Sequence, residues 1–348
     1  MGRSVIERGK GRLILVTSVG IAMIALFLVA SLAFGPVDMA FGTAIDSLLG
    51  AFGKPSAEMS INELIVYDIR LPRAIGAMAV GVGLSVAGVV FQAVIRNPLV
   101  DPYITGVSSG AGLGATSALV IGLSFLSVYS NFTVPIAAMA GALIAFAFTM
   151  AIAEGSGGRS VNYVLGGVIV GMALSSMTTL LMIYAGDKIH GVLFWLFGSF
   201  TDVGWDNVWM IVIPVAVMGA IVLLYAKELN LILLGEEQAR QLGLNVRVFS
   251  RSMLILASVL TAICVAFTGI IGFVGLIVPH ASRLIVGSDH RLLIPTTMVM
   301  GANVLLLGDL ISKLALEPVE LPIGAIMTLI GAPFFGYLLI RKGRSYVG

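Results

Sequence analysis

Residues that could do chemistry are scarce in this sequence, and the ones that stand out are cations beside long apolar runs. Charged residues make up 11% of the 348 residues, against about 25% in an average soluble domain. Arg70 and Arg73 bracket Pro72, and Lys313 follows a later apolar run. Such cations anchor helix ends at a membrane surface, or they receive carboxylates from a soluble partner protein. The pattern leaves both interpretations open.

Groupings typical of catalysis or metal binding are not present in the sequence. His280 has no acidic partner at a spacing that would suit a metal site with His190 or His290, which predicts a packing or capping role. The single cysteine, Cys264, excludes an internal disulfide and a thiolate metal cluster. No Ser/His/Asp grouping and no G-x-x-x-x-G-K-[ST] phosphate loop occurs. We therefore expect no catalytic residue, no metal site and no bound cofactor, so that any ATP and Mg would bind to a partner subunit.

The elements around these residues are long uncharged runs. Hydrophobic residues make up 58% of the chain and mean hydropathy is +1.06, and a bilayer crossing needs about 20 mostly apolar residues. The first run is too long for a signal peptide. We predict an all-α integral membrane protein that forms a single domain over residues 1–348 and has ten transmembrane helices. Six of them correspond to single runs, at 13–37, 74–95, 160–186, 207–226, 292–308 and 321–340. The other four form two pairs, one within 102–153 that breaks near Ser130-Asn131 and Pro135, and one of short helices within 252–282 that bends at Gly269–Gly275. The 42 glycines suit close contact between such helices.

The distribution of charge predicts the orientation. With ten crossings, 15 of the 20 lysines and arginines but only 7 of the 18 acidic residues fall on the side of the two termini. Because an excess of cations marks the cytoplasmic side, we expect a multi-pass protein of the cell (inner or plasma) membrane with both termini in the cytoplasm.

The predicted membrane cores contain no Asp, Glu, Lys or Arg. Ion-coupled carriers and many intramembrane enzymes place an ionisable group at that depth, so the pattern argues against both, although an ion-coupled secondary carrier is kept as the alternative. Phe194-Trp195 indicates an interfacial aromatic belt or part of a gate helix.

One polar segment, at about 227–250, could contact a partner. Glu236 and Glu237 at its centre, with Arg240 four residues after Glu236, favour a short helix that starts after Gly235 and ends at Gly243. Leu242 and Leu244 would then be exposed and suit docking. An ordinary solvated loop is the other interpretation.

Three long motifs resemble a known family. RLPRAIGAMAVGVGLSVAGVVFQAVIRNPLVDPYITGVSSGAG, which begins at Arg70, GIIGFVGLIVPHASRLIVGSDHRLLIP, which begins at Gly269, and ELPIGAIMTLIGAPFFGYLLIRKGR, which begins at Glu320, are similar to the signatures of permease subunits of type II ABC importers, the vitamin B12, heme and ferric-siderophore family. The resemblance covers essentially the whole chain.

The resemblance implies a homodimer with two ATP-binding cassette subunits on the cytoplasmic side and a substrate-binding protein on the other. It also implies functional positions. The translocation path would be lined by the fifth helix, with Gly167, Gly171, Ser175 and Ser176, and the cytoplasmic gate would be formed by Asn97, Leu99, Ser160 and Val161. The ATPase would couple through Glu236, Glu237, Ala239, Arg240, Leu242 and Gly243. The binding protein would dock on Arg70, Arg73 and Lys313. Lysine at the third docking position keeps the charge but loses the bidentate fork of arginine.

The resemblance implies a metal chelate as cargo: a ferric siderophore, cobalamin or heme. Some relatives carry molybdate or tungstate, but the predicted path offers no Arg or Lys to bind an oxyanion. We expect a ferric siderophore first, on the breadth of the family alone. The sequence does not distinguish a periplasmic from a lipid-anchored binding protein.

Overall fold

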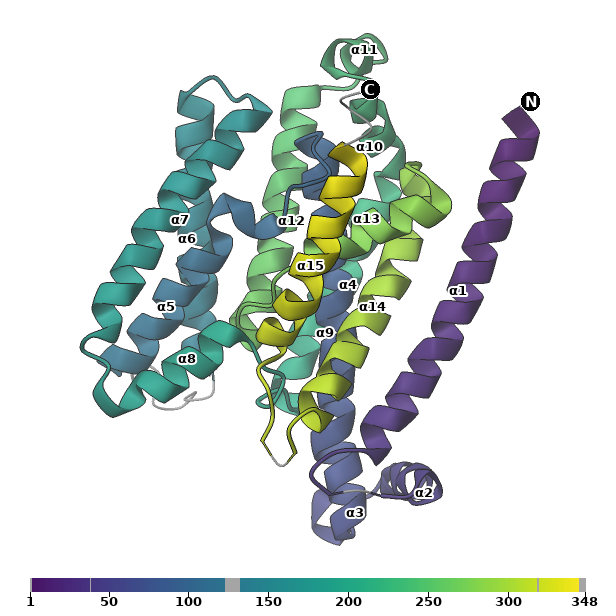
Figure 1. Cartoon of the computed structure of the whole chain (residues 1–348), viewed down its shortest axis with the longest axis vertical. Coiled ribbons are helices and arrows are strands. Elements are labelled where there is room, and N and C mark those ends of the chain that lie inside the picture. Colours follow the sequence, from purple (N-terminus) through teal and green to yellow (C-terminus); the bar gives the residue numbers. More distant parts are fainter. Residues whose placement is uncertain (1, 38, 123–131, 318, 344–348) are drawn as a thin grey trace.

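The computed structural model describes residues 2–37, 39–122, 132–317 and 319–343, and this part of the chain is helical without β-strands (Figure 1). The longer helices are α1 (Gly2–Ala33), α4 (Leu71–Val94), α6 (Thr133–Gly155), α7 (Ser160–Met182), α9 (Trp205–Leu224), α12 (Val246–Thr268), α14 (His290–Leu314) and α15 (Ile323–Gly343). The shorter ones are α2 (Phe41–Ala51), α3 (Ile61–Leu64), α5 (Val107–Ile121), α8 (Ile189–Phe197), α10 (Ala226–Leu233), α11 (Glu236–Gln241) and α13 (Val274–Val286).

Seven of the described helices are long and apolar enough to cross a membrane, and three shorter apolar segments, in α5, α13 and α15, accompany them. Together they match the ten predicted crossings. Two short crossings were predicted within 252–282. The second of them, α13, is short as expected, but the first, α12, is a full-length helix, so its predicted length is wrong. The predicted break at Ser130-Asn131 lies outside the described residues. Pro135 lies in the first turn of α6, where its missing N–H removes no helical hydrogen bond.

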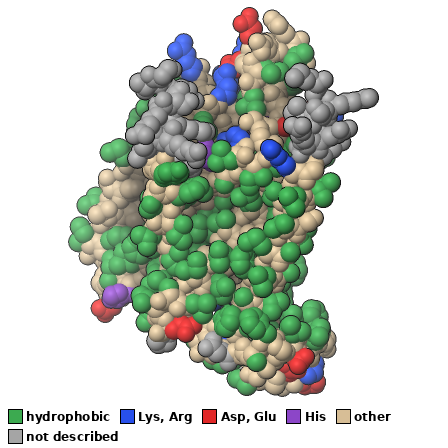
Figure 2. All heavy atoms as spheres, turned by 45° about the vertical axis from the view of Figure 1, so that its right-hand side comes forward, with side chains coloured by type: hydrophobic (Ala, Val, Ile, Leu, Met, Phe, Trp, Pro, Cys, Tyr) green, Lys and Arg blue, Asp and Glu red, His purple; other side chains and the backbone are tan. Residues whose placement is uncertain are grey.

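The molecule has two ends that differ in composition. In Figure 1, α1 begins and α15 ends at the end where α10 and α11 lie, which we call the terminal end. The other, which we call the far end, carries α2, α3 and α8. Figure 2 shows hydrophobic side chains over the middle of one face and charged side chains gathered toward the two ends. This is the surface expected of a multi-pass membrane protein.

Helix α4 is the centre of the bundle. It packs against α9, α12, α13 and α14, and almost all of its residues are buried. A Cβ on Gly81 would lie 2.1 Å from the carbonyl oxygen of Gly301, and one on Gly88 would lie 1.9 Å from that of Gly275. Glycine is therefore required at these crossings, which confirms that glycines permit close contact between the helices.

A second group, α5, α6 and α7, packs beside this centre and reaches the edge of the molecule in Figure 1. Helices α5 and α6 approach through Gly110 and Gly141, since a Cβ on either would lie within 2.3 Å of the other's carbonyl oxygen. The turn η3 (Pro102–Thr105) joins α4 to this group.

Several helices extend beyond the uncharged runs that predicted them, and α14 and α6 are two examples. Helix α14 continues past 308 and carries Asp309 and Lys313, both buried, and Glu154 lies in the last turn of α6. These charges lie at helix ends, outside the uncharged runs that were predicted as membrane cores. A search for uncharged runs ends each run at the first charged residue, but a helix can continue past that residue when its charged side chain is paired with an opposite charge.

Candidate functional site

The first predicted gate residues lie in the turn that ends α4. Arg96 has φ +56°, its N–H donates to Ala93 O, and the N–H of Asn97 donates to Gln92 O at 3.2 Å. This pair of bonds is a Schellman motif with Arg96 in the left-handed position. The Asn97 side chain then accepts from the N–H of Leu99 at 2.9 Å, which fixes the turn and leaves Leu99 half exposed.

The second pair of gate residues, Ser160 and Val161, begins α7. A short connection separates them from the end of α6, and its two glycines, Gly157 and Gly158, have φ +103° and +69°. Val161 is 55% exposed. The position of the gate residues at the start of α7 thus depends on how the end of α6 is held.

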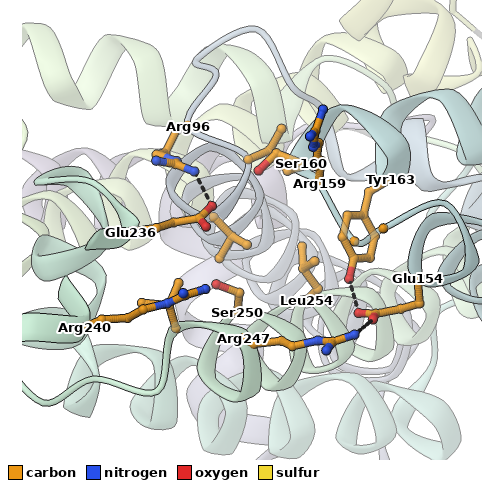
Figure 3. A pocket seen from close by; sticks show the side chains of 15 residues that line it. Arg96, Glu154, Arg159, Ser160, Tyr163, Glu236, Arg240, Arg247, Ser250 and Leu254 are labelled. Carbon is orange, nitrogen blue, oxygen red and sulfur yellow. Dashed lines mark hydrogen bonds and ion pairs between the residues drawn. The ribbon is translucent and has the colours of Figure 1, made fainter. Parts of the chain in front are cut away.

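A pocket of about 650 Å³ lies between these segments at the terminal end (Figure 3). It is lined by Val94, Ile95, Arg96, Glu154, Gly157, Gly158, Arg159, Ser160, Tyr163, Glu236, Arg240, Val246, Arg247, Ser250 and Leu254. One predicted gate residue, Ser160, therefore lines the same pocket as two predicted coupling residues, Glu236 and Arg240. Asn97, Leu99 and Val161 are outside the lining.

Two ion-pair groups border the pocket (Figure 3). Arg96, at the end of α4, pairs with Glu236 at the start of α11, with 2.5 Å between nitrogen and oxygen. Glu154 accepts from the Tyr163 hydroxyl at 2.6 Å and pairs with Arg247 at 2.8 Å and Arg251 at 2.7 Å.

The predicted coupling segment forms two helices, α10 and α11. As expected, α11 starts after Gly235 and ends before Gly243, and both glycines have positive φ. Ala239 is buried, Glu237 and Gly243 are exposed, and Leu242 is 62% exposed. The expected exposure of Leu244 is wrong, because this side chain packs against the main core.

Helix α7 carries the four predicted path residues, and the structure divides them between two faces. Gly167 packs on η3, where a Cβ would lie 1.9 Å from Ile104 O, and Gly171 lies beside Ser109. Ser175 donates to the Ser109 hydroxyl at 3.1 Å, and Ser176 to the carbonyl of its own helix at Met172. Both serines are exposed, but Ser175 faces α5 through Ser109, as Gly171 does, whereas Ser176 lies on the side of α7 that a second molecule could cover.

The three predicted docking cations lie at the far end and are buried. Arg70 and Arg73 are each 6% exposed and Lys313 is 3% exposed, so a docking partner could reach them only past the residues that cover them. Arg70 donates to the carbonyls of Leu32 and Ala33 at 2.7 and 2.8 Å, which belong to the last turn of α1. A cation is stabilised there by the helix dipole.

Arg73 and Lys313 share a carboxylate. Asp309 pairs with Arg73 at 2.9 Å and with Lys313 at 2.8 Å, and Glu320 pairs with Arg73 at 2.9 Å. Lys313 also donates to the Ser31 hydroxyl at 3.0 Å. Burial is tolerated because each cation has an anionic partner.

Sequence reasoning missed Asp309, Glu320 and Glu154 as partners of these groups. One signal was available, since Asp309 and Lys313 are four residues apart and face the same side of a helix. The others are separated by long stretches, 236 residues for Arg73 and Asp309, so no local pattern pairs them.

Asp101 caps η3 and lies just beyond the gate turn. Its carboxylate accepts from the N–H of Tyr103 at 2.8 Å. Burial raises the pKa of Asp101 from 3.8 to about 6, and the hydrogen bond from Tyr103 offsets part of this rise.

Comparison with known proteins identifies the family to which the chain belongs. A model of the FecCD transport family matches residues 23–341. The chain is 44% identical to the cobalamin import system permease protein of Halobacterium salinarum, covering 83% of this chain and 75% of the relative. It is 37% identical to the molybdate import system permease protein of Haemophilus influenzae, covering 82% and 83%.

A solved structure, an inward-facing conformation of a metal-chelate type ABC transporter, superposes with a TM-score of 0.81 at 30% identity, over 93% of this chain and 98% of that one. The match in sequence and the match in fold agree over nearly the whole length. The chain belongs to the FecCD transport family and is an ABC transporter permease subunit.

Proposed function

We propose that two copies of this chain form the path of an ATP-driven importer for a bulky metal chelate, with the terminal end in the cytoplasm. The observation that carries the proposal is the outer face of α7. Exposed side chains recur on it at helical spacing and include Leu165, Ile169, Met172, Ser176 and Leu180, and no residue of α7 is charged. A second copy would cover part of this face and leave a neutral channel between the two helices.

A neutral, partly apolar channel suits a large chelate that is held loosely and then released. An oxyanion would need fixed cations or hydrogen-bond donors along its way, and α7 supplies no cation. Cobalamin is the first cargo to test because one relative is named for it. Ferric siderophores and heme remain the other candidates, and the molybdate relative makes molybdate a necessary control.

The energy must come from a partner, because the chain has no phosphate loop. We assign ATPase docking to α10 and α11, which project at the terminal end (Figure 1). The excess of cations in the segments of this end supports a cytoplasmic orientation.

The binding protein would dock at the far end, on the surface that covers Arg73 and Lys313. Glu320 is the accessible member of this group, with 25% of its side chain exposed. A carboxylate of the binding protein could reach Arg73 by displacing Glu320, because Asp309 would remain on the other side of the guanidinium.

The test is reconstitution of the chain with its ATPase subunits in liposomes, with binding protein loaded with cobalamin, a ferric siderophore, heme or molybdate. We expect one loaded chelate to stimulate ATP hydrolysis and to be taken up in parallel, and molybdate to do neither. Uptake driven by a proton or sodium gradient, with no ATPase subunit bound, would instead establish the secondary carrier.

A further inference from the structure

We propose that ion pairs link the coupling helix α11 to both gate segments, with Arg96–Glu236 acting on the turn at Leu99 and Glu154 acting on the start of α7. The proposal rests on the proposed function and assigns the residues that connect the ATPase side to the gate.

The first link joins segments that are distant in sequence. Glu236 is the first residue of α11 and Arg96 follows the last turn of α4, 140 residues earlier. Arg96 immediately precedes Asn97 and is three residues from Leu99. Any displacement of α11 that carries Glu236 therefore pulls directly on the gate turn.

The backbone at Arg96 gives an independent reason to assign this side chain a role. Helices α6 and α11 end in the same Schellman motif as α4, and both place glycine in its left-handed position, Gly157 and Gly243. Only α4, of these three, uses a residue with a side chain there, at φ +56°. Glycine would be free of strain at this position, so an arginine that reaches Glu236 is best explained by what its side chain binds.

The second link runs through α12. Leu244 donates its N–H to Ala239 O at 3.0 Å, and Asn245 caps α12 by accepting from the N–H of Val248. This short connection ties α11 to the first turns of α12, where Arg247 and Arg251 lie. A displacement of α11 is therefore passed to both arginines.

Glu154 is ion-paired with both arginines, so a displacement of α12 would also move Glu154. It is the penultimate residue of α6, where the helix dipole disfavours a carboxylate, yet its side chain is only 19% exposed and has three partners on α7 and α12. The Arg247 and Arg251 pairs hold the end of α6 to α12, and the Tyr163 hydroxyl holds it to the first turn of α7. Ser160 and Val161 stand between these contacts.

The pocket between the two links leaves room for them to move. It separates Arg96 and Glu236 from Glu154 and Arg247 (Figure 3). Each link therefore borders open space into which its side chains can move, as a switching element requires.

The test uses two reporters on the complex of the chain with its ATPase subunits in nanodiscs. Leu99→Cys and Val161→Cys are separately labelled with a water-soluble maleimide, with and without ATP and vanadate, while Cys264 is fully buried and stays unlabelled. We expect the labelling rate at each position to change on trapping. Arg96→Gly, which also relieves the strained backbone, should reduce that change at position 99 at least about fivefold while ATP hydrolysis continues. Glu236→Gln should reduce the change to a similar extent, and its ATP hydrolysis is measured alongside because Glu236 begins the helix assigned to ATPase docking. Glu154→Gln should do so at position 161.

Controls separate the link from general effects. The exchange Arg96→Glu with Glu236→Arg should restore the change at position 99, and Arg291→Glu, an exposed charge at the start of α14, should leave both reporters unaffected. A normal change at position 99 in Arg96→Gly, or failure of the exchanged pair to restore it, would overturn the link. Failure of any ATPase subunit to bind would instead refute the proposed function, and it is visible before labelling begins.

Discussion

At the scale of single residues, the buried charges at the far end hold the fold together. Asp309 is 1% exposed and lies between Arg73 and Lys313. We expect Asp309→Asn to lower the free energy of unfolding by about 3–5 kcal/mol, because it leaves two buried cations with one remaining carboxylate. The control Glu317→Gln changes an exposed acid of the adjacent loop and should stay within about 0.5 kcal/mol. Thermal unfolding of both variants in detergent checks this, and equal melting temperatures would contradict it.

The same burial changes how docking should be tested. Reversing the charge of Arg73 would place a third carboxylate beside Asp309 and Glu320, so lost transport would report on folding. Glu320→Gln keeps Asp309 on Arg73 and alters only the more accessible partner. Its effect on binding-protein affinity is therefore the more specific measurement.

Asp101 gives a prediction for pH. Its pKa is raised from 3.8 to about 6 by burial, so the folded state binds the proton more tightly than the unfolded state. The resulting stabilisation is complete below about pH 4 and is lost as pH rises through about 6, a change of at most about 3 kcal/mol. Asp101→Asn keeps the cap and removes the titration. The stability of this variant relative to wild type should rise between pH 4 and 6, and a constant difference across that range would refute the assignment.

At the scale of elements, α4 depends on backbone contact with its neighbours. A Cβ on Gly88 would lie 1.9 Å from Gly275 O, an atom that cannot move aside without shifting α13. We expect Gly88→Ala to destabilise the protein by about 1–3 kcal/mol or more. Gly42→Ala is the matched control, since nothing lies within 4 Å of the added methyl, and it should be neutral or slightly stabilising. Melting temperatures in one detergent compare the two, and similar values would argue against the close crossing.

The elements also show how far sequence reasoning reaches. Uncharged runs located α4, α7 and α9 well, and two glycines bounded α11, because hydropathy and turn chemistry are local signals. Helices α2 and α3 were not predicted, since they are too short for a search based on crossing length, and α8 was indicated only by the aromatic pair Phe194-Trp195. The pairs Arg96–Glu236 and Arg73–Asp309 could not be read from the sequence, because tertiary packing alone brings them together.

At the scale of the whole molecule, α7 should meet α7 of a second copy near the terminal end. Leu165 is one turn beyond Val161 on the exposed face and is 55% exposed. We expect Leu165→Cys to form a covalent dimer with a short bismaleimide in native membranes, because residues near a two-fold axis lie opposite their own copies. Leu26→Cys, on the outer face of α1 and 62% exposed, is the control and should remain monomeric. Gel mobility after reaction measures both. A dimer through position 26 and none through 165 would place the two-fold axis beside α1, and the neutral face of α7 would then contact lipid instead of cargo.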